Sequence, residues 1–481
     1  MREEIFDKLN ILGEAAKFDV SCASSGVNRA GSKVAGTLGN SVGGGLCHSF
    51  TGDGRCVSLL KVLLSNDCIY DCKYCINRRS SDRPRATFQA RELAELTVEF
   101  YKRNYIEGLF LSSAVVCNPD ATMEAMCETV RLLRQEMGFF GYIHMKTIPG
   151  ASPELVELAG RLVDRLSVNI EFPSEEGLKK FAPQKNKQNI FGAMKYIGGR
   201  IDEDRETFRY RKRIGAAAAP MANLPAGRSG DLLRQGKAVH MPESFGKKDT
   251  KARTFTPGGQ STQMIVGATE DNDRKIIKLT EALYRKLSLK RVYYSAYVPI
   301  NKDPLLPNTP PPLLREHRLY QADWLLRFYG FTADEILDDT NPNLDLEYDP
   351  KCTWALRHMD LFPVEINRAD REMLLRVPGI GPGSVDKIIG YRKNGSLDFD
   401  DLKKMRIVLK RARFFITCKG KRMGPLDSDM NFIKANLSYD SRSVPLVSNY
   451  VQASMFGNMD KNCITGAVEN GLVRQNNGLY I

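Results

Sequence analysis

Three cysteines crowd into one short stretch of the sequence. Cys68, Cys72 and Cys75 follow the apolar run "SLLKVLLS" with the spacing C-x3-C-x2-C, which lets three thiolates turn toward one point from a single loop. A closed zinc site needs a fourth ligand and usually uses paired C-x2-C knuckles. A 4Fe-4S cluster, by contrast, can keep one iron open for an exogenous ligand. The spacing therefore favours an open cluster, with a structural zinc loop as the alternative.

The compartment also favours a metal-binding role for these thiols. The first residues, "MREEIFDKLNILGEAAKF", are charged and lack the apolar core of a signal peptide, and no later segment gives an apolar span of membrane length. We therefore expect a cytoplasmic protein with no membrane contact. The chain has 11 cysteines, an odd number. In a reducing compartment, clustered thiols more often bind metal or do chemistry than form disulfides.

The segment "CIYDCKYC" resembles the signature loop of the radical S-adenosylmethionine (radical SAM) enzymes, which follows the first strand of a barrel. The resemblance implies that SAM chelates the open iron and is cleaved, after one-electron reduction, to a 5'-deoxyadenosyl radical. It also implies an electron donor such as flavodoxin or ferredoxin. Tyr74, just before the last cysteine, could shield the cluster or contact the adenine of SAM.

The residues around the cysteines predict a parallel sheet that would position them. Short apolar runs alternate with helix-like stretches, as in repeated βα units. We expect strands at 58–65, 108–113, 141–148, 165–172, 262–268 and 291–299, with helices at 90–104, 122–137, 152–163 and 275–287. The predicted fold class is α/β: a radical SAM partial (β/α) barrel followed by a small all-α helix-hairpin-helix domain. In such barrels the active site lies at the carboxyl ends of the strands.

The same resemblance assigns a SAM-binding role to residues at those strand ends. The second strand commonly ends in a Gly-Gly-Glu-like run, and this chain has "LFLSSAVV" there, so Ser112 and Ser113 take that place. Asn169 and Glu171 match the polar fourth-strand positions that meet the ribose, and a surface or salt-bridged glutamate is the alternative for the second. Gly267 matches the fifth-strand position near adenine.

Other cysteines outside the triplet are candidates for chemistry. Cys22, Cys47 and Cys56 lie upstream and could form a second metal site, a zinc site or an auxiliary cluster, although their spacing is not diagnostic. The alternative is a glycine-rich loop folded over the barrel mouth. Cys117 follows the second strand and could return a hydrogen atom to a substrate radical, while a buried packing role is its alternative.

Positive charge is concentrated near the carboxyl end of the sequence. The formal net charge is +13, and residues 361–424 hold 15 Lys and Arg against 7 Asp and Glu, a local excess of +8. Basic surfaces attract nucleic acid electrostatically. Within this region, "NRADREMLLRV" and "SVDKIIGYRKN" predict two helices joined by the tight turn "PGIGPG", with Ser384 as the cap of the second helix.

This arrangement resembles the helix-hairpin-helix motif of DNA repair and recombination proteins, whose hairpin holds backbone phosphate without reading sequence. The following "FDDLKKMRIVLKRARFFI" resembles the second half of a doubled motif or a supporting helix. A structural hairpin, or one that binds protein or RNA, stays as the alternative. The predicted DNA-binding residues are Gly379, Ile380, Gly381, Gly383, Lys387, Arg392 and Lys393.

These features predict a domain order. We expect a cysteine- and glycine-rich leader (1–56), a radical SAM barrel (57–330) with a flexible insertion (213–256), a linker (331–360), the helix-hairpin-helix domain (361–424) and an extension of unknown role (425–481). A long helix at 310–337 precedes the linker, and Arg315, His317 and Arg318 are expected on its polar face.

The whole layout resembles the DNA modification/repair radical SAM proteins, which are thought to work beside a uracil-DNA-glycosylase-like partner. We therefore predict an enzyme that generates a 5'-deoxyadenosyl radical to modify or repair a nucleotide in DNA. One alternative is a non-catalytic DNA-binding iron-sulfur protein whose cluster is structural or senses redox state. Another is a radical SAM enzyme that modifies transfer RNA.

Overall fold

The computed structural model describes residues 2–16, 46–50, 56–214, 254–301, 303–423 and 430–437. A seven-stranded sheet forms the centre of the larger lobe, with its strands in chain order from β1 to β7. Strand β1 is antiparallel to β2, and strands β2 to β7 are parallel. The strands are Leu46–Phe50 (β1), Cys56–Leu63 (β2), Gly108–Ser112 (β3), Tyr142–Lys146 (β4), Arg165–Ser167 (β5), Gln260–Val266 (β6) and Leu289–Ala296 (β7).

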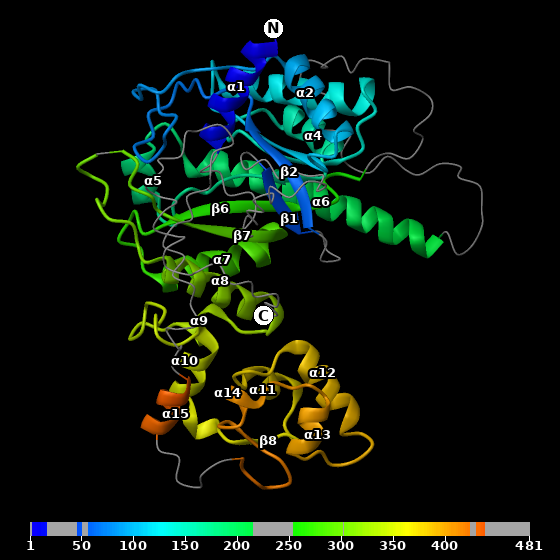
Figure 1. Ribbon diagram of the computed structural model, residues 1–481, viewed down its shortest axis with the longest axis vertical. Coiled ribbons are helices and arrows are strands. Elements are labelled where there is room, and N and C mark those ends of the chain that lie inside the picture. The colour runs from blue at the N-terminus through cyan, green and yellow to red at the C-terminus, as the bar shows by residue number, and fades with distance from the viewer. Residues whose placement is uncertain are drawn as a thin grey trace, which may run out of the picture.

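Helices connect the parallel strands and cover the outside of the sheet (Figure 1). Parallel strands need such crossovers, and strands in chain order with a helix between neighbours give a partial barrel. The predicted α/β class is therefore confirmed. The helices of this lobe are Arg2–Ala15 (α1), Ala90–Lys102 (α2), Pro119–Arg131 (α3), Leu132–Glu136 (η2), Pro153–Leu162 (α4), Glu175–Phe181 (α5), Lys187–Ile214 (α6), Asp273–Leu287 (α7) and Leu313–Phe328 (α8).

Local sequence explains where these elements begin and why they pack. Every residue of β3 and of β6 is buried, as expected for strands covered on both faces. Helix α3 begins after Asn118, whose side chain accepts a hydrogen bond from the backbone N–H of Ala121 at 2.8 Å. Pro119 occupies the first helical position, where a missing N–H costs nothing.

Two predicted elements end earlier than expected. The regular strand predicted at 165–172 ends at Ser167. Its pairing with β6 continues irregularly, since the N–H groups of Val168 and Ile170 donate to the carbonyls of Ser261 and Gln263, both at 3.1 Å, and Glu171 has a φ of 66°. The long helix predicted at 310–337 ends at Phe328. Gly330, with a φ of 70°, turns the chain there, and a capping box from Thr332 starts a new helix.

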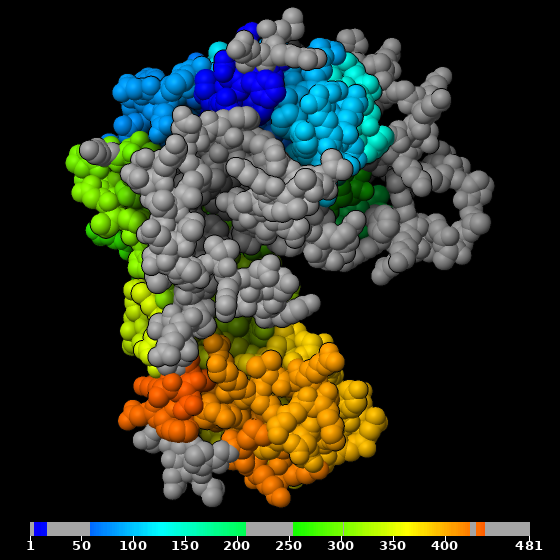
Figure 2. Space-filling model, in the orientation of Figure 1, coloured from blue at the N-terminus to red at the C-terminus, as the bar shows by residue number. Residues whose placement is uncertain are grey.

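A smaller lobe follows the sheet and is seen as the orange region of Figure 2. The region predicted as a linker contributes helices to it, and the module predicted to be all helical also has one pair of two-residue parallel strands. Its elements are Ala333–Ile336 (α9), Pro350–Arg357 (α10), Met359–Leu361 (η4), Val364–Glu365 (β8), Arg371–Arg376 (α11), Pro382–Tyr391 (α12), Phe399–Lys404 (α13), Leu409–Ala412 (α14), Ile416–Thr417 (β9) and Met430–Leu437 (α15).

A buried arginine joins the two lobes. The Arg376 guanidinium at the end of α11 donates to the backbone carbonyls of Tyr329 and Gly330, both at 3.2 Å. The same guanidinium forms an ion pair with Glu335 at 2.7 Å. Arg376 is 4% exposed, so these bonds are shielded from water and tie the smaller lobe to the end of α8.

Several predictions fall on parts of the chain that the structure does not describe. Cys22 lies outside the described residues, as do most of the insertion predicted at 213–256 and most of 425–481. Cys47 and Cys56 are described by backbone alone, in β1 and β2, so the predicted second metal site stays a prediction. Within the described ranges, none of the helices has the length and apolar character needed to cross a bilayer.

Candidate functional site

The cysteine loop leaves the carboxyl end of β2, where the resemblance places it. The backbone N–H of Leu64 donates to the carbonyl of Ser112 at 2.8 Å, so this strand end lies beside the end of β3. Cys72 is 5% exposed, and Cys68 and Cys75 are half-buried. The N–H groups of Tyr70 and Asn77 each point at a cysteine sulfur, Cys68 and Cys75 respectively, at 3.4 Å. Amide donors of this kind stabilise thiolates that bind a cluster.

Burial controls the protonation of these thiols. Burial raises the pKa of Cys75 to about 12, and the neighbouring Cys72 adds to that rise. Burial also raises the pKa of Cys72, an effect that the Lys185 cation opposes. Without metal the Cys72 and Cys75 thiols are therefore neutral at pH 7, and iron must displace their protons on binding.

The donor set fits an iron-sulfur cluster better than a single ion. Among the described residues, no three His, Cys, Asp or Glu side chains stand together at the separations that one metal ion needs. In a 4Fe-4S cluster each thiolate binds a different iron, so the sulfurs need not converge on one point. Three half-buried to buried thiols on one loop, two of them with amide donors, match that requirement.

Arg85 holds the shape of the loop that follows the cysteines. Its guanidinium donates to the backbone carbonyls of Arg78 at 2.6 Å, Ser81 at 3.0 Å and Asn77 at 3.1 Å. It also bonds the carbonyls of Asn66 and Arg79. Because one guanidinium bonds several carbonyls of the same turn, a single side chain holds the shape of that turn. Sequence reasoning missed this role, because the arginine looks like any other in a basic run.

A second segment braces the cysteine loop from across the barrel. The Asn301 side-chain amide donates to the carbonyls of Lys73 at 2.7 Å and Cys75 at 3.0 Å. The Lys73 ammonium forms an ion pair with Asp303 at 3.1 Å. Residues after β7 therefore contact residues after β2, and the first and last parallel strands contribute to one site.

Glu171, predicted at the ribose position, faces the cysteine loop through a lysine. The Lys185 Nζ lies 2.7 Å from a Glu171 carboxylate oxygen and 3.4 Å from the hydroxyl of Tyr74. Burial by itself lowers the pKa of Lys185, but the Glu171 carboxylate, with smaller contributions from Tyr74 and Cys72, outweighs burial and holds that pKa well above its usual range. The Tyr74 ring packs edge-on against Phe172, with centroids 5.1 Å apart. Lys185 is thus a fixed cation beside the predicted cluster.

Lys185 was missed by sequence reasoning. It lies between α5 and α6 in "FAPQKNK", where no periodicity or motif marks it. The one available signal was that Lys185 is a polar residue in the loop between the two helices that follow β5.

We expect Lys185→Met to lower the free energy of unfolding by about 3 kcal/mol, since removing one partner of a buried ion pair leaves the other charge unpaired. The Glu171 side chain is 6% exposed. Urea unfolding of the apoprotein measures the loss. Lys179→Met breaks the exposed ion pair with Glu175, whose side chains are 74% and 52% exposed, and is the matched control. The control should cost less than about 1 kcal/mol. Equal losses in the two variants would contradict the special role of Lys185.

The remaining predicted SAM-site residues lie near the same strand ends. Ser112 is fully buried at the end of β3, and the Ser113 hydroxyl donates to the carbonyl of Ala114 at 2.7 Å. The Asn169 side-chain amide donates to Gln263 at 3.2 Å, which links the segment after β5 to β6. Cys117 is exposed in the loop that leads from β3 to α3.

Gly267 occupies a close approach of two chain segments. Its φ is 84°, and a Cβ added there would come within 2.4 Å of the Pro311 ring. The structure therefore gives a packing reason for glycine at this position, in the space that the sequence resemblance reserved for adenine. Contact with adenine stays a prediction.

The small lobe presents the predicted hairpin. Helices α11 and α12 are joined by a turn in which Gly379 has a φ of 85°, a conformation that favours glycine. Ile380 is 1% exposed and anchors the turn, while its carbonyl accepts from the buried Lys351 Nζ at 2.5 Å. Helix α12 begins at Pro382 with Gly381 as its N-cap. The predicted Ser384 cap is wrong, because Pro382 is already suited to the first helical position and starts the helix two residues earlier.

The basic residues predicted on the hairpin differ in their surroundings. The Arg392 guanidinium donates to the backbone carbonyls of Ala369 at 2.6 Å and Ile366 at 3.1 Å, so that nitrogen holds the lobe together. Lys387 donates to the carbonyl of Met405 at 3.2 Å. Lys393 and Gly383 are exposed. The charge predicted from the sequence is therefore only partly directed outward.

A second turn in this lobe repeats the backbone pattern of the first. Arg406 between α13 and α14 has a φ of 58°, and the next residue, Ile407, is 5% exposed. Gly379 and Ile380 show the same order of a left-handed residue followed by a buried isoleucine. The two helical pairs therefore share one local geometry.

The fold and the cysteine loop together match one class of protein: α/β barrel enzymes that bind an iron-sulfur cluster at the carboxyl ends of their strands. Residues 62–207 match the family model of the Radical SAM superfamily, so this part of the chain is a radical SAM domain. Members of the superfamily bind a 4Fe-4S cluster and SAM. The cluster cysteines, Glu171 and Lys185 all fall within the matched residues.

Solved structures similar to this chain include two of the [FeFe]-hydrogenase maturase HydG. The protein from Carboxydothermus hydrogenoformans is 14% identical, with a TM-score of 0.34, and the match covers 55% of this chain and 49% of that one. A second HydG structure is 11% identical, with a TM-score of 0.35 and coverage of 55% and 48%. The chain thus spans about half the length of each. A comparison with curated proteins finds no match.

Proposed function

We propose that this radical SAM enzyme modifies or repairs a nucleotide in DNA that the α11–α12 hairpin holds. The observation that carries the proposal is the hairpin itself, with its left-handed Gly379 and a ten-residue helix that begins at a glycine N-cap. Gly381 has no side chain to satisfy the first amides of α12, so these can donate to a phosphate oxygen. A tight glycine turn also lets a phosphate backbone approach closely.

The positive charge of the smaller lobe supports the binding of a polyanion there. Residues 361–424 carry a net charge of +8, and sequence-independent binding to DNA comes mainly from such charge. Exposed Lys393 can supplement the hairpin amides. Contacts of this kind position DNA and do not specify a base.

In the proposed reaction, the chain's own residues hold and shield the reacting groups. Cys68, Cys72 and Cys75 would hold the cluster, which with SAM supplies a 5'-deoxyadenosyl radical when bound. Tyr74 and Phe172 exclude water from one side of the loop by their edge-on packing. Glu171, oriented by Lys185 at 2.7 Å, would accept hydrogen bonds from the ribose hydroxyls.

Further residues complete the proposed site. Ser112, Ser113, Asn169 and Gly267 would line the SAM pocket at the same strand ends. Cys117, exposed after β3, would give the hydrogen atom of its S–H bond to a substrate radical and be left as a thiyl radical. A base in a duplex is poorly reachable, so we expect a flipped or damaged nucleotide. A uracil-DNA-glycosylase-like protein is a proposed partner.

The test is mass spectrometry of DNA oligonucleotides that carry damaged or modified bases. The oligonucleotides are incubated without oxygen with the reconstituted protein, SAM and dithionite, and Cys72→Ala protein is run in parallel. A mass change in DNA that needs Cys72 supports the proposal. A change confined to transfer RNA would move the substrate to RNA. An absence of 5'-deoxyadenosine under reduction would leave a non-catalytic iron-sulfur protein.

A further inference from the structure

The segment that follows the last cysteine forms a basic surface beside the predicted cluster. Residues 78–85, "RRSSDRPR", contain four arginines and one aspartate, and we refer to them as the arginine loop. The Arg85 guanidinium points inward to backbone carbonyls, as described above. Arg79 and Arg83 are exposed and form no ion pair with the described residues. Arg79 and Arg83 therefore present positive charge to solvent.

The arginine loop is held in a fixed position against the cysteine loop. The Asp71 carboxylate accepts from the backbone N–H of Ser80 at 3.0 Å and from its hydroxyl at 2.7 Å. The N–H of Arg79 donates to the carbonyl of Tyr70 at 2.8 Å. Asp71 and Tyr70 lie between the first two cluster cysteines. A partner bound to the arginine loop would therefore lie next to the loop that carries the predicted cluster ligands.

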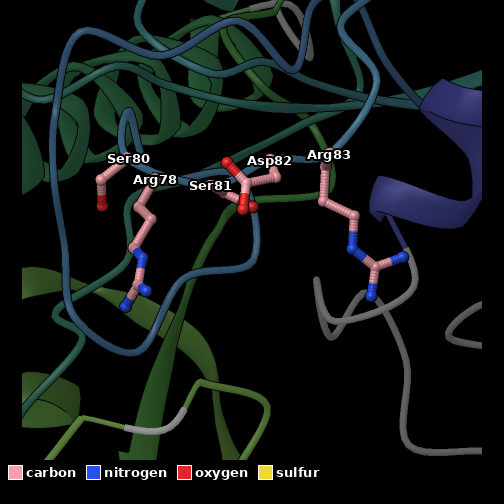
Figure 3. A pocket seen from close by; sticks show the side chains of 5 residues that line it. All are labelled: Arg78, Ser80, Ser81, Asp82 and Arg83. Carbon is pink, nitrogen blue, oxygen red and sulfur yellow. The ribbon is translucent and has the colours of Figure 1, made fainter.

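A hollow of about 300 Å³ lies on this surface, lined by Arg78, Ser80, Ser81, Asp82 and Arg83. Figure 3 shows the side chains of Arg78 and Arg83 extending to the same side of the loop, with Asp82 between them. A carboxylate between two arginines repels a phosphodiester but can pair with a cation on another protein. Such mixed charge fixes the register of a protein partner.

We propose that the arginine loop is the docking surface for an acidic protein that carries a low-potential, one-electron centre. The inference rests on the proposed radical chemistry, which needs one electron per turnover from outside the chain. The carrier gives up one electron to the site and leaves oxidised, and no bond or proton moves. Opposite charges steer such encounters and speed association.

The test compares two double variants with the same change in charge. Arg79→Glu with Arg83→Glu reverses the exposed cations of the arginine loop. Lys102→Glu with Arg103→Glu is the control, on exposed residues at the end of α2. The end of α2 leads into the amino end of β3, whereas the cysteine loop leaves the carboxyl end of β2. The two therefore lie at opposite ends of the parallel strands. Iron content and the urea midpoint confirm that each variant is folded and loaded.

Binding of oxidised flavodoxin to the holoprotein is measured at two salt concentrations. We expect the arginine-loop variant to bind about tenfold more weakly at low salt, and to lose the salt dependence of the wild type. The control should change less than about twofold. SAM cleavage driven by dithionite should be unchanged in both variants, whereas cleavage driven by reduced flavodoxin should fall in the first.

Two results would overturn the proposal. Unchanged flavodoxin affinity in the arginine-loop variant would remove the docking surface. Weaker DNA binding with unchanged flavodoxin affinity would make the loop a nucleic-acid surface instead. Failure of the proposed DNA function is a separate outcome, since it would show as wild-type protein that binds flavodoxin normally and does not bind or alter DNA.

Discussion

We expect Cys72→Ala to abolish cluster binding and SAM cleavage. The affinity for DNA should change by less than about twofold, because the two sites lie in different lobes. Cys72 is the most buried cysteine of the loop, at 5% exposure. Removing a direct ligand should cut bound iron to about a tenth or less, because even altered outer partners cost about 10- to 100-fold in metal affinity.

Iron per chain and 5'-deoxyadenosine formed under reduction are the measurements for Cys72→Ala. Cys127→Ala is the matched control, since Cys127 is also buried, at 2% exposure, but lies in α3 away from the loop. The control should keep its iron and its SAM cleavage. Normal SAM cleavage by Cys72→Ala would refute the ligand assignment, and with it the enzymatic function.

Gly379→Val should weaken DNA binding by about tenfold or more, with little dependence on sequence. A valine at a φ of 85° is a severe outlier, and its Cβ would lie 3.3 Å from the carbonyl of Val408 and from the backbone nitrogen of Ala412. The turn must therefore shift, and the first amides of α12 shift with it. Gly381 tolerates substitution better, because its φ of −100° suits any residue and an added Cβ meets the Tyr329 hydroxyl at 3.2 Å.

Fluorescence anisotropy with a random-sequence duplex at fixed salt measures the effect of Gly379→Val. Gly390→Val is the matched control on the same helix, since Gly390 has an ordinary helical conformation and open space around it. The control should bind DNA as the wild type does. A folded Gly379→Val variant with undiminished affinity would remove the hairpin from the DNA-binding account.

The sequence predicted the parallel sheet and the cysteine loop because their signals are local. Apolar runs of strand length and the C-x3-C-x2-C spacing can be read in short windows. The destination of the long cationic side chains could not be read in this way. Arg318, expected on a polar face, is 1% exposed and donates to the carbonyls of Asp345, Leu346 and Glu347.

The same limit explains the residues that sequence reasoning missed or misplaced at the sites. Arg392 was assigned to DNA, and its guanidinium instead bonds carbonyls within the lobe. Lys185 and Arg85 were not singled out. Lys185 acts through an ion pair with Glu171, and Arg85 acts through backbone carbonyls, and neither kind of partner is marked in the sequence. Composition gives the number of charges, whereas tertiary structure decides which of them are neutralised.

The clamp that Arg85 places on five backbone carbonyls has an entropic consequence. A flexible loop must lose conformational freedom when it binds its inorganic guest, at a cost of about 1–2 kcal/mol for each residue that becomes fixed. Here the turn is already ordered by the polypeptide, so that loss is incurred during folding instead of during metal uptake. The turn keeps its shape whether or not metal is bound. Metal binding then requires removal of protons from sulfur without reorganisation of the chain.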